Sequence, residues 1–264
     1  MHRLRIASLM ADNAAFFSRD LAHYLGQTLG LQVDVVQDVP WQERERQLYR
    51  GEAHLGVVCG LQYVCAKDRD ETPGVDVLCA PVMRAPRYKN RPIYFSEVVV
   101  RRDHPASSLA DLRGASFAFN EPTSHSGYAL PRYVLASRGE TNGFFGRVVE
   151  SGAHERSLEM ILDGSVDAAA IDSTVLEQEV RQVPSLRTEL RSIDTLGPSP
   201  IPPLVVSRSV PRPLRAAIQS ILLNVHQDPE GALLLERAHM SRFVSVTDAD
   251  YDPIRTMARQ GAGW

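Results

Sequence analysis

The stretch YFSEVVVRRDHP, residues 94–105, decides the fold, because it breaks a regular alternation of strands and helices. Its run of β-branched residues predicts a buried strand that leads into a proline and a new segment. A second stretch of this kind, PPLVVSR, occupies residues 202–208. We infer that the chain crosses between two lobes on these strands, outward near residues 97–102 and back near residues 203–208.

Short apolar runs alternate with longer amphipathic segments along most of the remaining chain. Alternation of this kind predicts an α/β fold with largely parallel sheets. The first amphipathic segment, residues 13–30, is expected to be a helix, with Asn13 as a candidate cap and Gly30 as its stop.

The two crossing strands define the expected lobes. Lobe 1 is discontinuous, with residues 1–99 and 204–264, and lobe 2 comprises residues 100–203. Two α/β lobes joined in this way leave a ligand cleft lined by the carboxyl ends of strands and the starts of helices. We therefore expect the functional residues at these positions.

Composition excludes several classes of protein. The 264 residues carry a net charge of -3, and the 29 Lys and Arg residues form no dense clusters, which argues against nucleic acid as a partner. No apolar run approaches the roughly 18 residues that span a bilayer. Cys59, Cys65 and Cys79 have a spacing and an odd number that fit neither a zinc site nor a disulfide framework. We expect buried free thiols and no metal.

The first residues, MHRLRIASLMADN, contain an apolar stretch at residues 6–11. This stretch is too short and too interrupted for the core of a secretory signal. We therefore expect no export signal in the sequence as given. A chain that starts at Met1 in this form would stay in the cytoplasm.

The segment NEPTSHSGYAL, residues 120–130, places hydroxyl side chains where a strand ends and a helix is expected to begin near Ser126. The first N–H groups of a helix have no partner within it, so a loop with Ser124, Ser126 and Gly127 can bind an anion. Alternatively, one of these serines only caps the helix. A nucleophilic serine with His125 as its base is disfavoured, because the segment lacks the first glycine of G-x-S-x-G.

A second helix start repeats the pattern. The segment VVESGAHERSLEMI, residues 148–161, runs from a strand through Ser151 and Gly152 to His154 in the first helical turn. An imidazole at this position can donate a hydrogen bond to an oxyanion. HERS does not match H-E-x-x-H, so a zinc site of that type is excluded. The alternative is an exposed polar residue in a first turn.

Three further residues are candidates for contacts with a ligand. Asp172 follows the apolar run VDAAAI, residues 166–171, where it could accept a proton from a ligand, contact a cationic group or cap the next helix. Tyr63 and Tyr94 lie near strand ends in the first lobe. A buried tyrosine is commonly a core residue with a satisfied hydroxyl, so both alternatives stay open for each of them.

Residues 94–103, 109–128 and 144–173, and more weakly residues 55–64, resemble the phosphate/phosphite/phosphonate-binding proteins of ABC transporters. These proteins are a branch of the type 2 periplasmic binding proteins, and the resemblance implies their two-lobed fold. It also implies a ligand site formed by Ser124, His125, Ser126, Gly127, His154, Asp172, Tyr94 and Tyr63. The position of His125 is often threonine in relatives, so the exact ligand stays open.

The resemblance implies reversible binding of a small oxyanion, such as phosphate, phosphite or an organophosphonate. The lobes would close around the ligand, and neither a cofactor nor a catalytic step is needed. The implied partner is an ABC permease or, for a sensor, a signalling protein, and the implied location is the periplasm. The alternative is a cytoplasmic enzyme of the same fold, such as a menaquinone-pathway enzyme that acts on a carboxylate-bearing substrate.

Overall fold

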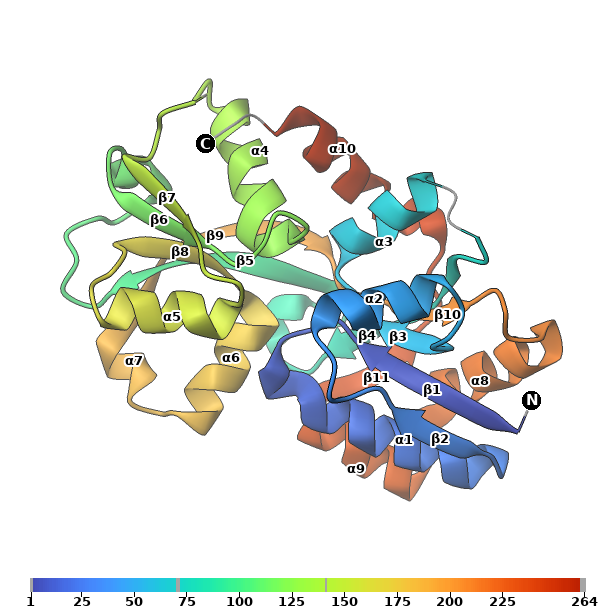
Figure 1. Cartoon of the computed structure of the whole chain (residues 1–264). Helices are drawn as coiled ribbons and strands as arrows, with labels where there is room; N and C mark the ends of the chain where they lie inside the picture. The colour runs from blue at the N-terminus through green and yellow to red at the C-terminus, as the bar shows by residue number, and fades with distance from the viewer. Residues whose placement is uncertain (1, 70–71, 141, 262–264) are drawn as a thin grey trace. The chain divides into compact units, whose positions relative to one another are not determined.

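The computed structural model describes residues 2–69, 72–140 and 142–261 (Figure 1). Its contacts divide the chain into two compact units, the first with Met1–Ile93 and Pro200–Asp252, the second with Tyr94–Ser199 and Pro253–Trp264. The boundaries fall before residues 94 and 200 instead of near 100 and 204. The segment after Asp252 is grouped with the second unit, because Met257 packs into the core of that unit.

The first unit contains a six-stranded sheet with the order β11-β4-β10-β3-β1-β2. Its strands are β1 (Arg3–Ser8), β2 (Gln32–Val35), β3 (Leu55–Val57), β4 (Val75–Met83), β10 (Leu204–Ser207) and β11 (Met240–Val244). β1 is parallel to β2 and β3, whereas β10, the second expected crossing strand, is antiparallel to β3 and β4. The sheet is therefore mixed and not largely parallel, because the chain enters β10 from the second unit and not through a helical crossover.

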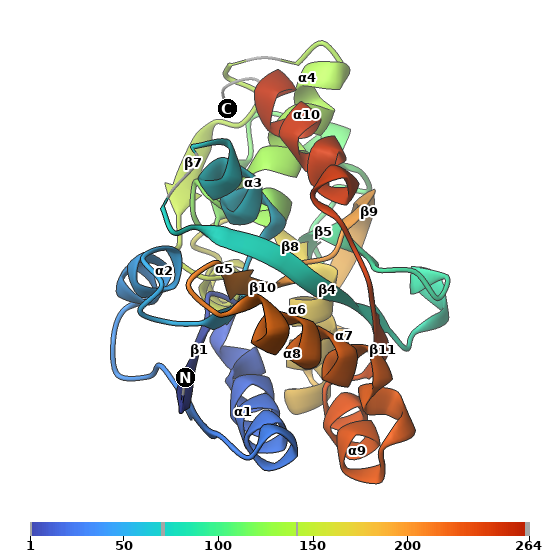
Figure 2. The same ribbon diagram turned by 90° about the vertical axis from the view of Figure 1, so that its right-hand side faces the viewer.

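The helices of the first unit cover this sheet. They are α1 (Ala15–Leu29), α2 (Trp41–Tyr49), α3 (Gly60–Asp68), α8 (Arg212–Asn224) and α9 (Pro229–Arg237). Figure 2 shows α1 beside α8 and α9, and these helices are in contact. Leu21 and Leu25 of α1 share one buried cluster with Ile218 and Leu222 of α8. The apolar faces of these helices thus form the core of the unit.

Of the two predicted ends of α1, the carboxyl-terminal one is confirmed and the amino-terminal one is wrong. Gly30 ends the helix in the left-handed conformation with a φ of 63°, as its sequence position indicated. The prediction of Asn13 as the cap is wrong, because Asn13 lies in a 3₁₀ turn at Asp12–Ala14. Ala14 is therefore the residue that flanks α1, and it provides no side-chain cap.

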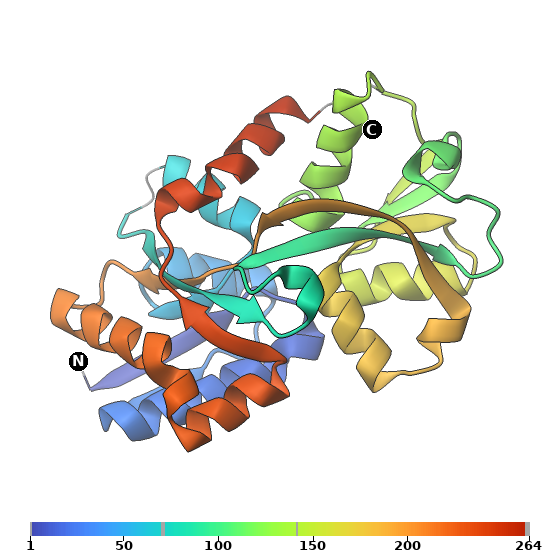
Figure 3. The same cartoon turned by 180° about the vertical axis from the view of Figure 1, so that it is seen from behind.

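The second unit contains a five-stranded sheet with the order β7-β6-β8-β5-β9. Its strands are β5 (Ile93–Arg101), β6 (Ser116–Phe119), β7 (Arg147–Glu150), β8 (Ala168–Asp172) and β9 (Leu190–Pro200). Its helices are η4 (His125–Ala129), α4 (Leu130–Ser137), α5 (His154–Leu162), α6 (Ser173–Gln182), α7 (Leu186–Glu189) and most of α10 (Asp252–Gln260). β6 is parallel to β7 and β8, and β5 is antiparallel to β8. Figure 3 shows β9 running beside β5.

Both faces of the second sheet are covered, which explains why its central strands are mostly apolar. Alternate side chains of a strand point to opposite faces. One face packs against α4 and α10 through Val98, Val100, Phe117, Ala168, Ala170, Leu130, Leu135 and Met257. The other packs against α5 and α6 through Val99, Ala118, Ala169, Ile171, Leu158, Ile161 and Leu176. Within β5 the buried side chains of Ser96 and Glu97 are the exceptions, and the other candidate functional groups lie at strand ends and in the loops that follow.

The three cysteines are free thiols, as predicted. Cys79 is buried, but Cys59 and Cys65 are only half-buried, so the prediction of burial is correct for one of the three. Across the described residues, no group of three or more His, Cys, Asp or Glu side chains is placed to hold a metal ion. Within the same residues, no helix is both long enough and apolar enough to cross a membrane.

Candidate functional site

The segment NEPTSHSGYAL joins β6 to α4. Its central turn, η4, is a π-helix that continues directly into α4, so the α-helix begins at Leu130 and not near Ser126 as expected. Ser124 flanks η4, and its Oγ accepts a hydrogen bond from the N–H of Gly127 at 3.1 Å. The capping role considered for Ser124 is therefore confirmed. Because its Oγ accepts this bond, its O–H can still donate to a ligand.

Two further contacts hold η4 in place. The hydroxyl of Ser96, on β5, donates to the carbonyl oxygen of Ser126 at 2.7 Å, and both residues are buried. An added Cβ at Gly127 would lie 2.0 Å from Oδ1 of Asn120, so only glycine fits at this position. The backbone of η4 is thus fixed, and the N–H groups of a first helical turn can face an anion, except that of Gly127, which donates to Ser124.

The second helix start meets the first. α5 begins at His154, and the flanking Ala153 provides no side-chain cap. Nε2 of His154 lies 3.1 Å from Oγ of Ser126, so a hydrogen bond joins α5 to η4. His154 is buried, and the alternative of an exposed polar residue is therefore wrong. Burial also lowers the pKa of His154 to about 4, so that the imidazole is neutral at about pH 7.

Strand β6 anchors both helix starts. The N–H of Ser151 donates to the carbonyl of Phe119, and the N–H of Gly152 donates to the carbonyl of Asn120, each at 2.8 Å. The hydroxyl of Ser151 also lies 2.7 Å from that of Ser157 in α5. The loop before α5 is therefore held against the end of β6, where NEPTSHSGYAL begins.

The side chain of His125 is completely buried. Its Nε2 lies 2.9 Å from Oγ of Ser199 in β9, and its ring centroid lies 6.3 Å from that of Tyr94. Burial lowers the pKa of His125 to about 3, so this imidazole is neutral as well. The bond to Ser199 favours a structural role for the imidazole over the ligand contact predicted for it.

Asp172 ends β8 and caps α6. Its Oδ1 accepts hydrogen bonds from the N–H and the hydroxyl of Thr174, both at 2.7 Å, so the capping alternative is confirmed. Asp172 is paired in register with Ser96, which holds η4, and therefore lies at the same end of the sheet. Burial raises the pKa of Asp172 to about 6, although the bonds from Thr174 oppose the rise. A ligand contact of this carboxyl stays a prediction.

The structure brings most of the predicted site residues together. Seven of them lie in the second unit: Ser124, His125, Ser126, Gly127, His154, Asp172 and Tyr94. Tyr63 belongs to the first unit, where its hydroxyl donates to Asp248 at 2.7 Å and its ring packs edge-on against Tyr251. Tyr63 is thus a core residue with a satisfied hydroxyl, which was the alternative considered for it.

Comparison with known families identifies the class of protein. Residues 15–251 match the family described as "ABC transporter, phosphonate, periplasmic substrate-binding protein". The chain belongs to this family of phosphonate-binding proteins. The predicted resemblance is confirmed, and so is the type 2 periplasmic-binding-protein fold, because solved phosphonate-binding proteins have the same fold.

Individual phosphonate-binding relatives differ widely from this chain in sequence. The phosphonates-binding periplasmic protein of Escherichia coli strain K12 is 28% identical over 172 residues, which are 63% of this chain and 51% of that protein. The match thus spans about half the length of this relative. The binding protein of a Pseudomonas aeruginosa phosphonate transporter has a TM-score of 0.82 at 19% identity, over 97% of this chain and 85% of that one. A Prochlorococcus marinus structure with methylphosphonate has a TM-score of 0.85 at 18% identity, over 98% of each chain.

Three residues that support the site of this phosphonate-binding family member were not predicted. Ser96 is detectable from the sequence, because it is a small polar residue within a mostly apolar strand. Asn120 stands at the end of a strand, where asparagine is most simply interpreted as a turn residue. Ser199 gives no local signal, since it lies 74 residues from its partner His125.

Proposed function

We propose that this chain reversibly binds a small oxyanion of the phosphonate class and is the substrate-binding component of an ABC-type uptake system. The contact between the two helix starts, Ser126 Oγ to His154 Nε2 at 3.1 Å, supports the proposal most directly. Helix N-termini favour anions through their unpaired N–H groups and aligned peptide dipoles. Two such ends meet at this point, each with a polar side chain that can donate.

The chemistry of these groups suits a tetrahedral oxyanion. The hydroxyls of Ser124 and Ser126, the imidazole of His154 and the first N–H groups of η4 can supply about four to six hydrogen bonds. Hydrogen bonds to a charged group contribute roughly 1.5–3 kcal/mol each. Their sum covers the roughly 8 kcal/mol of a micromolar complex after ordering costs. Binding therefore requires no metal and no covalent step.

The relatives support a phosphonate as the class of ligand. The Escherichia coli relative is named as phosphonates-binding, and the Prochlorococcus marinus structure contains methylphosphonate. Phosphate and phosphite share the tetrahedral head and remain candidates for the same site. In this proposal Asp172 contacts a protonated ligand oxygen or a cationic substituent, because its buried carboxyl can lose or gain a proton close to pH 6.

Titration calorimetry with methylphosphonate, phosphite, phosphate and sulfate tests the proposal. We expect at least one phosphorus oxyanion to bind, and Ser126→Ala to weaken binding about 10- to 100-fold, since one charge-assisted hydrogen bond is lost. Ser137→Ala is the matched control, because the exposed hydroxyl of Ser137 bonds a carbonyl within α4. If no anion binds, and native mass spectrometry finds no anion retained from purification, the proposal is wrong.

The proposed partner is the permease of a phosphonate transporter. We expect the ligand-loaded protein to stimulate ATP hydrolysis by that transporter in reconstituted vesicles, whereas a sensor with the same site would not. The family comprises substrate-binding proteins, which favours binding over the enzyme alternative. Accordingly, mass spectrometry should detect no conversion of carboxylate-bearing substrates.

A further inference from the structure

Two buried polar atoms beside the candidate site have unused hydrogen-bonding capacity. Asn120 is 9% exposed and His154 is 7% exposed. Among the residues that the structure describes, neither Oδ1 of Asn120 nor Nδ1 of His154 has a hydrogen-bond partner. A buried polar atom without a partner destabilises the fold, so each such atom requires an explanation.

The two atoms flank the same glycine. A Cβ added to Gly127 would lie 2.0 Å from Oδ1 of Asn120 and 3.2 Å from Cε1 of His154, the ring carbon bonded to Nδ1. The Asn120 oxygen and the imidazole carbon are therefore separated by at most the sum of these distances. One bridging water, or a small rotation of the amide, connects Oδ1 with Nδ1 over such a separation.

An acceptor such as the amide oxygen of Asn120, placed beside Nδ1, selects the tautomer of His154. A neutral imidazole has one N–H donor and one acceptor nitrogen. Because Oδ1 can only accept, it stabilises the tautomer with the proton on Nδ1. In that tautomer Nε2 is the acceptor, and Ser126 donates its hydroxyl hydrogen in the 3.1 Å bond to His154.

We propose that Asn120 is a positioning residue that keeps a proton on Nδ1 of His154, so that Nε2 takes up a second proton when a dianionic oxyanion binds. The inference deepens the proposed function and rests on it. The proton comes from solvent, or from the ligand when the ligand arrives as a monoanion. The Ser126 hydroxyl then turns from Nε2 to a ligand oxygen, and the new Nε2–H donates to the same anion.

The bound anion drives this protonation. In the free protein, burial lowers the pKa of His154 to about 4, so the imidazole is neutral. Two negative charges within hydrogen-bonding distance raise that pKa by several units, even at an effective dielectric constant of about 20. The imidazolium then has two N–H groups, and Oδ1 of Asn120 accepts the one that faces away from the ligand.

Other titratable groups lie on the elements around His154. The elements packed against α5 are β6, β8 and α6, and residues 116–119 of β6 include none that titrates. The groups on β8, α6 and η4 are Asp172, Glu177, Glu179, Arg181, His125 and Tyr128. Burial raises the pKa of Asp172 to about 6, so its carboxylate is the competing proton acceptor. Asp172→Asn removes this competitor from any count of protons.

Nitrogen-15 NMR of the imidazoles tests the tautomer without a ligand. At about pH 7 we expect a neutral His154 with its proton on Nδ1, and a shift of the proton toward Nε2 in Asn120→Leu. Asn120→Asp is the matched control, since it retains an acceptor oxygen and should keep the proton on Nδ1. A wild-type ring protonated on Nε2 would overturn the inference, whatever the protein binds.

Calorimetry in two buffers of different ionisation enthalpy then counts the protons taken up with methylphosphonate. At about pH 8.5, where the dianion predominates, we expect uptake close to one proton per ligand for wild type and for Asp172→Asn. Asn120→Leu should lose most of this uptake and about tenfold in affinity. Ser126→Ala should bind methylphosphonate more weakly but take up the same number of protons. This result would distinguish a general weakening of binding from the loss of proton uptake expected for Asn120→Leu.

The outcomes distinguish the two proposals. Binding by the wild type without proton uptake would overturn the role of Asn120 and leave the proposed function intact. Uptake that persists in Asn120→Leu would also overturn it, since a purely structural residue lowers affinity without changing the proton count. A failure to bind any oxyanion would overturn the proposed function, and the NMR experiment would still decide the tautomer.

Discussion

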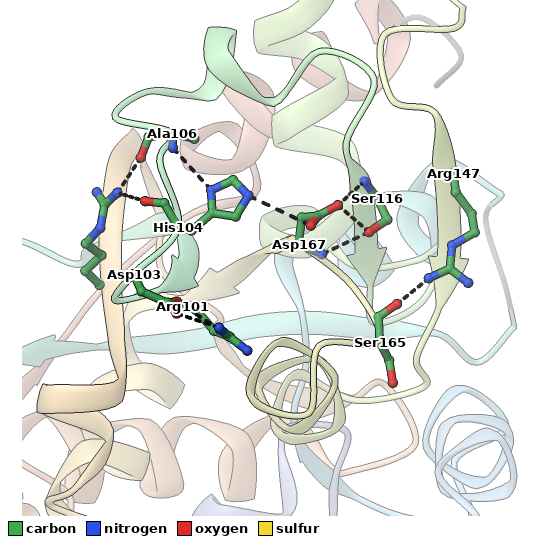
Figure 4. A network of polar contacts seen from close by, with 9 residues as sticks. Arg101, Asp103, His104, Ala106, Ser116, Arg147, Ser165 and Asp167 are labelled. Carbon is green, nitrogen blue, oxygen red and sulfur yellow. Dashed lines mark hydrogen bonds and ion pairs between the residues drawn. The ribbon is translucent and has the colours of Figure 1, made fainter.

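Strands β6 and β8 have a similar set of polar side chains at each end. At the amino-terminal ends of the strands, Oδ2 of Asp167 accepts bonds from the N–H and hydroxyl of Ser116 at 2.7 and 2.6 Å, and Nε2 of His104 lies 3.8 Å from Oδ1 (Figure 4). We call these three residues the solvated network. At the carboxyl-terminal ends, or in the segments that follow them, lie Ser126, His154 and Asp172, here called the buried cluster.

Access to water separates the two groups. The side chain of Asp167 is 44% exposed, whereas Asp172 is 3% exposed. Burial acts to raise the pKa of Asp167, but hydrogen bonds from Ser116 and the nearby His104 hold it below its usual value. At Asp172 burial prevails and raises the pKa to about 6. The ionised form of Asp167 therefore stabilises the fold, whereas that of Asp172 destabilises it, as is frequent at functional sites.

Of the variants that test this contrast, Asp172→Asn should change the free energy of unfolding most. The pKa of Asp172 is about 6 in the folded chain, above its ordinary value of 3.8, so the folded state binds the proton more tightly. The free energy of unfolding of the wild type therefore falls as pH rises through about 4 to 6, by about 3 kcal/mol. Asparagine caps helices as well as aspartate does. We expect the variant to be more stable by up to about 3 kcal/mol at about pH 7.5.

Urea denaturation at several pH values measures this difference. The stability of the variant and of the wild type should converge below about pH 3, where Asp172 is protonated in both states. A variant that is less stable than the wild type at about pH 7.5 would show that the carboxylate has a stabilising partner, and would remove the contrast with Asp167.

Gly127→Ala should destabilise the buried cluster by about 1–3 kcal/mol, the usual cost of overpacking. Its Cβ would lie 2.0 Å from Oδ1 of Asn120. Gly164→Ala is the control, because that glycine has a φ of +78° and nothing within 4 Å, so its cost is backbone strain alone. Asn120→Ala in the Gly127→Ala background should recover part of the loss. Additive effects in this double-mutant cycle would contradict the contact.

The sequence predicts the elements of this fold better than it predicts their junctions. Apolar runs and the stop at Gly30 locate strands and helices, because these signals are local. The antiparallel direction of β10 and the packing of Met257 in the second unit depend on distant segments, so no local pattern indicates them. In the site, Ser-Gly pairs at helix starts are visible in the sequence. The partnership of His125 with Ser199 is not, because it spans 74 residues.

Asp167→Asn should show the opposite pH dependence to Asp172→Asn. The pKa of Asp167 is lowered in the folded chain, so its contribution is present at neutral pH and is lost as pH falls through its folded pKa. Because this carboxylate is 44% exposed, we expect a loss of only about 1 kcal/mol at about pH 7, measured by urea denaturation. Parallel pH profiles for the two variants would contradict the role assigned to water.

His104→Gln should have the smallest effect, below about 0.5 kcal/mol at about pH 7. Nδ1 of His104 accepts the N–H of Ala106 at 3.2 Å, so in the neutral ring the proton is on Nε2, which faces Asp167. The glutamine amide can make both contacts. Where it does not, water can hydrogen-bond to the carboxylate of Asp167 instead. His154→Gln is the matched variant in the buried cluster, where bulk water does not reach the side chain and the loss should be larger. If thermal or urea unfolding showed that His104→Gln and His154→Gln lose the same free energy of unfolding, burial would not distinguish the two ends of β6 and β8.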